Sequence, residues 1–194
     1  MKLLIDSSTI YLLIGLIDND NNIKTYYRES KNDHSETIVD LLNQFLKNNN
    51  KTIDDITEIY VGRGPGSYTG ERISGTIAKI LSYLRNLPLY SFSSLDLISS
   101  YMLDNDGSYV SHIIAKKNSI YYKKIDVINH EILLGDELFG DLDILNNYQE
   151  QKILNMNDEF LLSLQISFMN IIKYKLYQEE SNLDYVPNYL RSVV

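Results

Sequence analysis

Cysteine is absent from the 194 residues, and only three histidines occur. Without cysteine the chain forms no disulfide, offers no thiolate to a metal and carries no cysteine nucleophile. The histidines are His34, His112 and His130, and they lack the HxxxH and HExxH spacings that place two metal ligands on one helix face. The sequence therefore gives no indication of a zinc peptidase, and we expect no metal site.

Long apolar runs are also missing, since no segment approaches the ~20 apolar residues needed to cross a bilayer. The N-terminal run MKLLIDSSTIYLLIGLID is interrupted by Asp6, and no small-residue cleavage site follows it. We interpret this run as part of the fold rather than as an export signal. The expectation is a cytoplasmic protein with no membrane contact.

Positive charge is scarce, because 18 Lys and Arg residues stand against 26 Asp and Glu residues and give a formal net charge of −8. Nucleic acids are bound mainly through Lys and Arg that neutralise phosphates, so the chain alone is expected to bind RNA poorly. A local basic patch at Lys116, Lys117, Lys123 and Lys124 is an alternative. A solvated strand edge is the favoured interpretation of these lysines.

The first half of the chain alternates between strand and helix patterns. Apolar runs and turn residues predict an antiparallel three-strand meander, and its nearly continuous apolar runs favour a sheet covered on both faces. Apolar residues at helical spacing then predict two helices, the first capped by Asp33 with Glu36 three residues later. The expected elements are strands at 3–6, 11–17, 23–27 and 56–61, and helices at 33–47 and 70–85.

The second half gives weaker signals. A further strand at 89–92 and a helix at 94–101, capped by Ser93 or Ser94, are followed by a hairpin around the KKNS turn. The turn sequence DNDG at 104–107 suggests a boundary, which divides the chain into regions 1–103 and 104–194. The expected elements of the second region are strands at 109–115, 120–128 and 131–134 and one helix at 158–177.

The stretch GRGPGSYTG at residues 62–70 carries four glycines and a proline between a predicted strand and a predicted helix. It is not a Walker A loop, because Glu71 and Arg72 follow Gly70 where that motif requires Lys and Ser or Thr. It is not a dinucleotide fingerprint either, because the third glycine comes one residue too late. Two interpretations remain open: a turn that holds an anion on backbone N–H groups with Ser67, Tyr68 and Thr69, or a turn that packs closely against another backbone.

The residues GPGSYTGERISGTIAK closely resemble the GPGSFTGxRIGxxxAKGL signature of the bacterial TsaB (YeaZ) family. In chain order, IDSST at 5–9, DHSETIVDLL at 33–42, SSLDLIS at 93–99 and PNYLR at 187–191 are similar to the family's IDT/ST, HSExLLPxI, STLEALA and PxYLR segments. The resemblance covers essentially the whole chain. The loop motif is specific, and the other segments gain weight from their order.

This resemblance implies an α/β fold of the actin-like, or ASKHA (ribonuclease H-like), type, with two lobes of mixed sheet flanked by helices. It implies a non-catalytic subunit that works with the TsaD transferase and the ATPase TsaE to make threonylcarbamoyladenosine in tRNA. The expected partners are TsaD, TsaE and, through the same helices, a second copy. No cofactor is expected in this chain, and tRNA is expected to reach it only through the complex.

The resemblance also implies where the partner binds, since family members pair through the two helices on either side of the glycine loop. We therefore expect the loop to set the angle of the second helix. The loop residues are Gly62, Gly64, Pro65, Gly66, Ser67, Thr69, Gly70 and Arg72. The candidate partner-binding residues, some of which must pack on the chain's own sheet, are Ile38, Leu41, Leu42, Phe45, Ile73, Ile77, Ile80 and Leu84.

Catalytic members of the superfamily hold a nucleotide between the lobes with acidic groups and glycine turns. Here SST follows Asp6 in place of a glycine-containing turn, and a turn cap is the favoured role for Asp6. IAKKNSIYY at 114–122 replaces the family's DARxGEVY, so a carboxylate is lost at Ile114. No catalytic residue is assigned, and the rival hypothesis is a small-molecule kinase or ATPase that uses Asp6 and the glycine loop.

Overall fold

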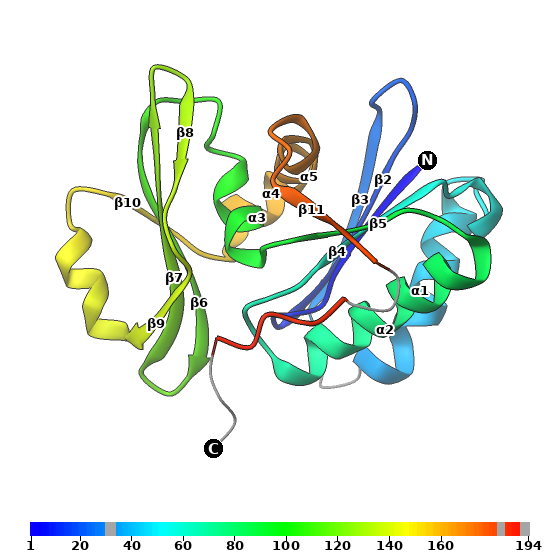
Figure 1. The fold of residues 1–194 in the computed structure, drawn as a ribbon, viewed down its shortest axis with the longest axis horizontal. Helices are drawn as coiled ribbons and strands as arrows, with labels where there is room; N and C mark the ends of the chain where they lie inside the picture. The colour runs from blue at the N-terminus through cyan, green and yellow to red at the C-terminus, as the bar shows by residue number, and fades with distance from the viewer. Residues whose placement is uncertain (30–33, 182–184, 191–194) are drawn as a thin grey trace.

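The computed structural model describes residues 1–29, 34–181 and 185–190, and two β-sheets with helices packed on them make up the fold (Figure 1). The first sheet has the strand order β11-β5-β4-β1-β2-β3. In this sheet β1, β4 and β5 run parallel, and the other pairings are antiparallel. Its strands are β1 (Lys2–Asp6), β2 (Tyr11–Ile17), β3 (Ile23–Glu29), β4 (Glu58–Gly62), β5 (Leu89–Phe92) and β11 (Tyr177–Glu180).

The predicted meander is confirmed as β1, β2 and β3. The Asp18 carboxylate accepts hydrogen bonds from the backbone N–H groups of Asp20 (2.9 Å) and Asn22 (2.8 Å), which fixes the turn between β2 and β3. β1 and β2 are buried on both faces, as their apolar runs predict. The same prediction is wrong for β3, which is only partly buried because it forms the edge of the sheet in the described part of the chain.

Two helices, α1 (His34–Asn48) and α2 (Tyr68–Arg85), lie together against one face of this sheet (Figure 1). Both were predicted from their periodicity, although the predicted cap Asp33 lies outside the described residues. α2 ends at Asn86, whose left-handed conformation (φ 52°) closes the helix. A short 3-10 turn, η1 (Ile53–Asp55), leads from α1 towards β4.

The second sheet has the order β10-β6-β7-β8, and β9 also pairs with β7. The predicted hairpin around KKNS is confirmed, with Asn118 in the left-handed region at its turn (φ 63°). β9, β10 and the 3-10 segment η2 were not predicted. The elements are β6 (Gly107–Lys116), β7 (Ser119–Ile128), β8 (Glu131–Leu134), β9 (Leu138–Asp141), η2 (Leu142–Tyr148) and β10 (Lys152–Leu154).

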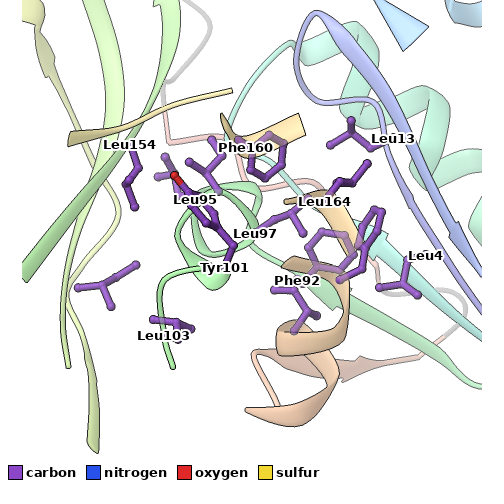
Figure 2. Close-up of a cluster of buried hydrophobic side chains, with 14 of the residues drawn as sticks. Leu4, Leu13, Phe92, Leu95, Leu97, Tyr101, Leu103, Leu154, Phe160 and Leu164 are labelled. Carbon is purple, nitrogen blue, oxygen red and sulfur yellow. The ribbon is translucent and has the colours of Figure 1, made fainter. Parts of the chain in front are cut away.

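Three short helices lie between the sheets and carry one continuous apolar core. They are α3 (Ser94–Ser100), α4 (Asp158–Leu162) and α5 (Leu164–Lys173). Figure 2 shows this core running from Leu4 and Leu13 of the first sheet, past Leu95 and Phe160, to Leu154 of the second. The two sheets therefore share this core, and each sheet also carries a separate apolar cluster.

A buried ion pair also joins α3 to the second sheet. The Nζ atom of Lys123 on β7 lies 2.7 Å from the Asp96 carboxylate, and both side chains are almost fully buried. Lys116 and Lys117 are exposed at the hairpin turn. The interpretation of these lysines as a solvated edge is therefore wrong for Lys123, because a carboxylate far away in the sequence lies opposite it.

The predicted single helix over 158–177 is wrong. α4 and α5 are separated at Ser163, α5 ends at Lys173, and Lys175 adopts a left-handed conformation (φ 53°). The chain then enters β11, where Tyr177 packs edge-on against the ring of Tyr60, 5.0 Å away. This packing in the first sheet overrides the helical pattern of the local sequence.

The C-terminal segment, Tyr185–Leu190, runs along α2 and back towards the second sheet (Figure 1). Tyr185 is buried in the core beneath α1 and α2, with its ring against Gly75 and its hydroxyl donating to the Gly62 carbonyl (3.3 Å). Asn188 donates its backbone N–H to the Arg63 carbonyl (2.7 Å) and its side-chain amide to Glu137 of the second region. The division at residues 103 and 104 stays a prediction, although β11 and Tyr185 return to the first sheet.

Candidate functional site

The glycine loop connects β4 to α2. Gly62 ends β4, Gly64, Pro65 and Gly66 form the turn, and Gly64 adopts a positive φ of 85°. Ser67 caps α2, because its hydroxyl accepts a hydrogen bond from the Gly70 N–H (3.3 Å). The remaining predicted loop residues, Thr69, Gly70 and Arg72, lie in the first turns of the helix.

The loop packs directly on the turn between β1 and β2. The Ser67 N–H donates to the Ser8 carbonyl (2.5 Å), and the Ser7 hydroxyl donates to the Gly70 carbonyl (2.7 Å). A Cβ atom at Gly66 would overlap the carbonyl oxygen of Ser8, and one at Gly70 would overlap that of Ser7. Close packing against another backbone therefore accounts for these glycines, and carbonyl oxygens lie where an anion would need N–H donors.

Asp6 has the role of a turn cap. Its carboxylate accepts hydrogen bonds from the Ser8 N–H (2.8 Å) and from the Ser94 hydroxyl (2.7 Å) on α3. The Ser8 hydroxyl in turn donates to Ser94 (2.7 Å). The favoured interpretation of Asp6 is confirmed in this respect, since the carboxylate holds the β1–β2 turn and α3 together.

A second carboxyl group, that of Glu71, is buried beside Asp6 and was not singled out from the sequence. Its side chain is 2% exposed, and one carboxyl oxygen, Oε2, has no hydrogen-bond partner within the described residues. Burial raises the pKa of Glu71 to about 8, the negative charge of Asp6 adds to the rise, and the Gly66 N–H opposes it. Glu71 is therefore mostly protonated at neutral pH.

A cavity of about 820 Å³ lies between the β1–β2 turn, the start of α2 and strand β6. None of its lining residues is Asp, Glu, Lys or Arg, and burial lowers the pKa of His112, which keeps that side chain neutral. The cavity wall therefore offers hydroxyl groups, one amide, one neutral imidazole and apolar side chains, but no charge to a ligand. The lining residues are Ser8, Thr9, Ile10, Ser67, Thr69, Gly70, Ile73, His112, Ile113, Ile114, Ala115, Asn155 and Met156.

The structure divides the eight candidate partner-binding residues. Ile38, Leu42 and Phe45 of α1 are buried in the core against the first sheet. These three are therefore among the candidates that pack on the chain's own sheet, as was expected for part of the set. Leu41, Ile73 and Ile77 are partly buried at the margin of the same core.

Ile80 and Leu84 remain exposed on α2, and Leu84 is 72% exposed. Two further apolar side chains accompany them: Val39 on α1 and Tyr83 on α2, which is 69% exposed. We call these four exposed side chains, Val39, Ile80, Tyr83 and Leu84, the α1–α2 surface. Tyr83 was missed by the sequence analysis, although its spacing of three from Ile80 is the signal that would have found it.

Arg72 lies outside the turn rather than in it. Its guanidinium group stacks 3.8 Å from the centre of the Tyr68 ring, and its Nε atom donates to the Tyr189 hydroxyl (2.9 Å). This exposed stack holds the C-terminal segment against the start of α2.

Among the residues that the structure describes, no group of three or more His, Asp or Glu side chains is arranged to hold a metal, and no helix is long and apolar enough to cross a membrane.

A family model described as TsaD, tRNA N6-adenosine threonylcarbamoyltransferase, matches residues 25–179 of the chain. The chain belongs to this family. Its curated relatives include proteins named TsaB, tRNA threonylcarbamoyladenosine biosynthesis protein, which confirms the resemblance to the TsaB branch.

The TsaB protein of Bacillus subtilis is 32% identical over 119 residues, which are 61% of this chain and 52% of that protein. The chain thus matches about half the length of this relative. The TsaB protein of Buchnera aphidicola from Acyrthosiphon pisum is 24% identical over 190 residues, 95% of this chain and 82% of that protein.

A solved structure from Pseudomonas aeruginosa, described as an uncharacterized protein with similarity to peptidase YEAZ, superposes with a TM-score of 0.75. It is 18% identical, and the alignment covers 98% of this chain and 99% of that one. At this identity the likeness concerns the fold alone. Together with the family match it confirms the predicted actin-like fold, with two mixed sheets flanked by helices.

Proposed function

We propose that the chain is a non-catalytic subunit of the assembly that makes threonylcarbamoyladenosine in tRNA. It binds and stabilises a TsaD-type transferase, and it helps to form the surface on which a TsaE-type ATPase docks. The names of the TsaB relatives support the pathway. ATP, the activated threonylcarbamoyl group and tRNA belong to the assembly, and tRNA contacts this chain only indirectly.

The observation that carries this proposal is the closed glycine turn. The Ser7 and Ser8 backbone fills the space beside Gly66 and Gly70, so the family's signature residues serve the position of α2 rather than a ligand. The neutral wall of the adjoining cavity also fits poorly with a magnesium nucleotide, which needs charged partners. A structural role for the turn is the simpler explanation.

The surface that meets the transferase is the α1–α2 surface. Exposed Tyr83 and Leu84 lie three and four residues after exposed Ile80, which puts all three on one side of α2. An apolar stripe of this kind binds another helix by burying its area from water. Isolated copies of the chain pair through the same side chains, so that a homodimer competes with the heterodimer.

The test is co-expression of the full chain with the transferase of the same organism, with Tyr83→Asp or Leu84→Asp in the chain. Each variant buries an unpaired charge in the proposed interface, and we expect affinity to fall by about 30-fold or more. Leu162→Asp is the matched control, because Leu162 is 85% exposed at the end of α4. Leu42→Asp is unsuitable, since Leu42 lies in the core.

Retention of full affinity by both folded α2 variants, or an equal loss in the Leu162→Asp control, contradicts the proposed surface.

The rival hypothesis of a kinase or ATPase is tested separately by calorimetry of the isolated chain with ATP and magnesium. Micromolar binding with turnover favours the rival and overturns the non-catalytic role. The proposal places the protein in the cytoplasm, with the other members of the assembly.

A further inference from the structure

Strands β8 and β9 form one edge of the second sheet. β8 and β9 follow one another along the same side of β7, at Ile125–Ile128 and Ser119–Tyr122. Neither has another partner strand in the described part of the chain. Their outward backbone N–H and C=O groups therefore form an edge to which a further strand can be added.

Apolar side chains are exposed on both faces of this edge. Leu134 lies opposite Ile125, whose side chain is in the core facing α3. Leu133 lies opposite Asp126, and Leu138 lies opposite Tyr122, which faces η2 on the other side of the sheet. All three leucines are between 45 and 47% exposed. Phe139 is not counted, because it packs against Tyr121.

The two-sided exposure decides what kind of partner fits. A helix or a second sheet would cover one face of the edge and leave the other in water. An added strand covers both faces at once, because successive side chains of a strand point to opposite faces. The edge also lacks the lysines and prolines with which natural edge strands avoid pairing, since neither residue occurs between Ile128 and Gln151.

The negative charge of this edge restricts the kind of strand that can bind to it. Six acidic residues and no Lys or Arg occur between Ile128 and Gln151, namely Glu131, Asp136, Glu137, Asp141, Asp143 and Glu150. Glu137 is engaged by Arg63 and Asn188, whereas Glu131, Asp136 and Asp141 are exposed. Two copies of this edge would bring like charges together, which opposes self-pairing. A strand that carries Lys or Arg fits the same edge.

We propose that the β8–β9 edge binds an extended segment of another protein, apolar at its centre and rich in Lys or Arg at its ends, by adding it as a strand to the second sheet. The inference does not depend on the proposed function, because the α1–α2 surface belongs to the first sheet. It assigns a second docking surface to the chain.

The test uses the full chain and a fluorescent ten-residue synthetic peptide with two lysines at each end and six alternating Val and Thr residues between them. We expect saturable binding tighter than about 1 mM, measured by fluorescence anisotropy. Hydrogen exchange should slow in β8 and β9 and stay unchanged in α1 and α2. A peptide of the same sequence with alternate backbone nitrogens methylated cannot complete the ladder and should bind at least about tenfold more weakly.

Two pairs of substitutions separate the apolar and backbone contributions. Leu133→Lys with Leu138→Lys should weaken binding at least about tenfold, and Leu133→Thr with Leu138→Thr, which keeps strand propensity, should weaken it less. Leu162→Lys is the matched control and should leave binding unchanged. No binding at about 1 mM, equal binding of the methylated peptide, or protection outside β8 and β9 overturns the proposal. Self-association through this edge, lost in the Leu133 and Leu138 variants, also overturns it.

Discussion

Two regions of the molecule bury a carboxyl group, and they stabilise it by opposite means. At the junction of α3 and β7, Asp96 lies 2.7 Å from the ammonium group of Lys123. At the glycine turn, Glu71 has no cation beside it among the groups that shift its pKa, and its nearest charge is the carboxylate of Asp6. In the first region burial raises the pKa of Asp96 and the ammonium group of Lys123 opposes that rise, whereas the second region removes the charge by holding a proton.

The largest effect is expected from breaking the pair in the first region. Lys123→Met leaves a buried, unpaired carboxylate, and we expect the free energy of unfolding to fall by about 3 to 5 kcal/mol. Urea unfolding measures the loss. The double variant Lys123→Met with Asp96→Leu should recover most of it, and a double variant as unstable as the single one would contradict the role given to the pair.

A smaller effect is expected from the backbone packing in the second region. Gly70→Ala places a Cβ atom against the Ser7 carbonyl oxygen, and the overlap should lower the free energy of unfolding by about 3 kcal/mol. Thr76→Ala, at an exposed position of α2, is the control for helix propensity. If Gly70→Ala is as stable as the parent chain, the turn does not depend on close contact with β1–β2.

The smallest effect is expected from Glu71→Gln, and it has the opposite sign. The pKa of Glu71 is raised by burial to about 8 in the folded chain, so the folded state holds a proton that the unfolded state releases above pH 4.5. Stability from this group is therefore full below about pH 4.5, declines by about 1.4 kcal/mol per pH unit as pH rises, and levels off above about 8.

The amide introduced by Glu71→Gln does not titrate in this range, so the substitution should remove that part of the decline and gain roughly 2 kcal/mol at neutral pH. Urea midpoints between pH 5 and 9 measure the difference between the parent and the variant. A parallel pH dependence of the two proteins would show that Glu71 is not the group responsible.

Much of the fold follows from local patterns in the sequence. The turn residues at 18–22 and the KKNS turn each define a hairpin, and the spacing of apolar residues defines α1 and α2. β9, β10 and β11 escaped prediction because each is only three or four residues long and depends on a partner strand elsewhere in the chain. In β11 the rings of Tyr60 and Tyr90 supply that context.

The site was predictable in its position more than in its detail. The glycine loop and both helices were found from the sequence, but periodicity does not reveal which side of a stripe meets the sheet. It thus could not separate buried Leu42 from exposed Leu84. Glu71 stood in a variable position of the family signature, and its burial depends on the distant Asp6 turn. Lys123 was misread for the same reason, since its partner Asp96 precedes it by a long stretch of chain.

The return of the C-terminal segment to the first sheet has a consequence for biosynthesis. β11 closes the sheet beside β5, and Tyr185 fills the core next to Gly75, so the N-terminal half lacks two of its packing partners until residues 177–185 leave the ribosome. The first half therefore reaches its final packing only after residues 177–185 have been synthesised. A nonsense codon before residue 177 would damage the packing of the first half although it leaves the sequence of that half intact.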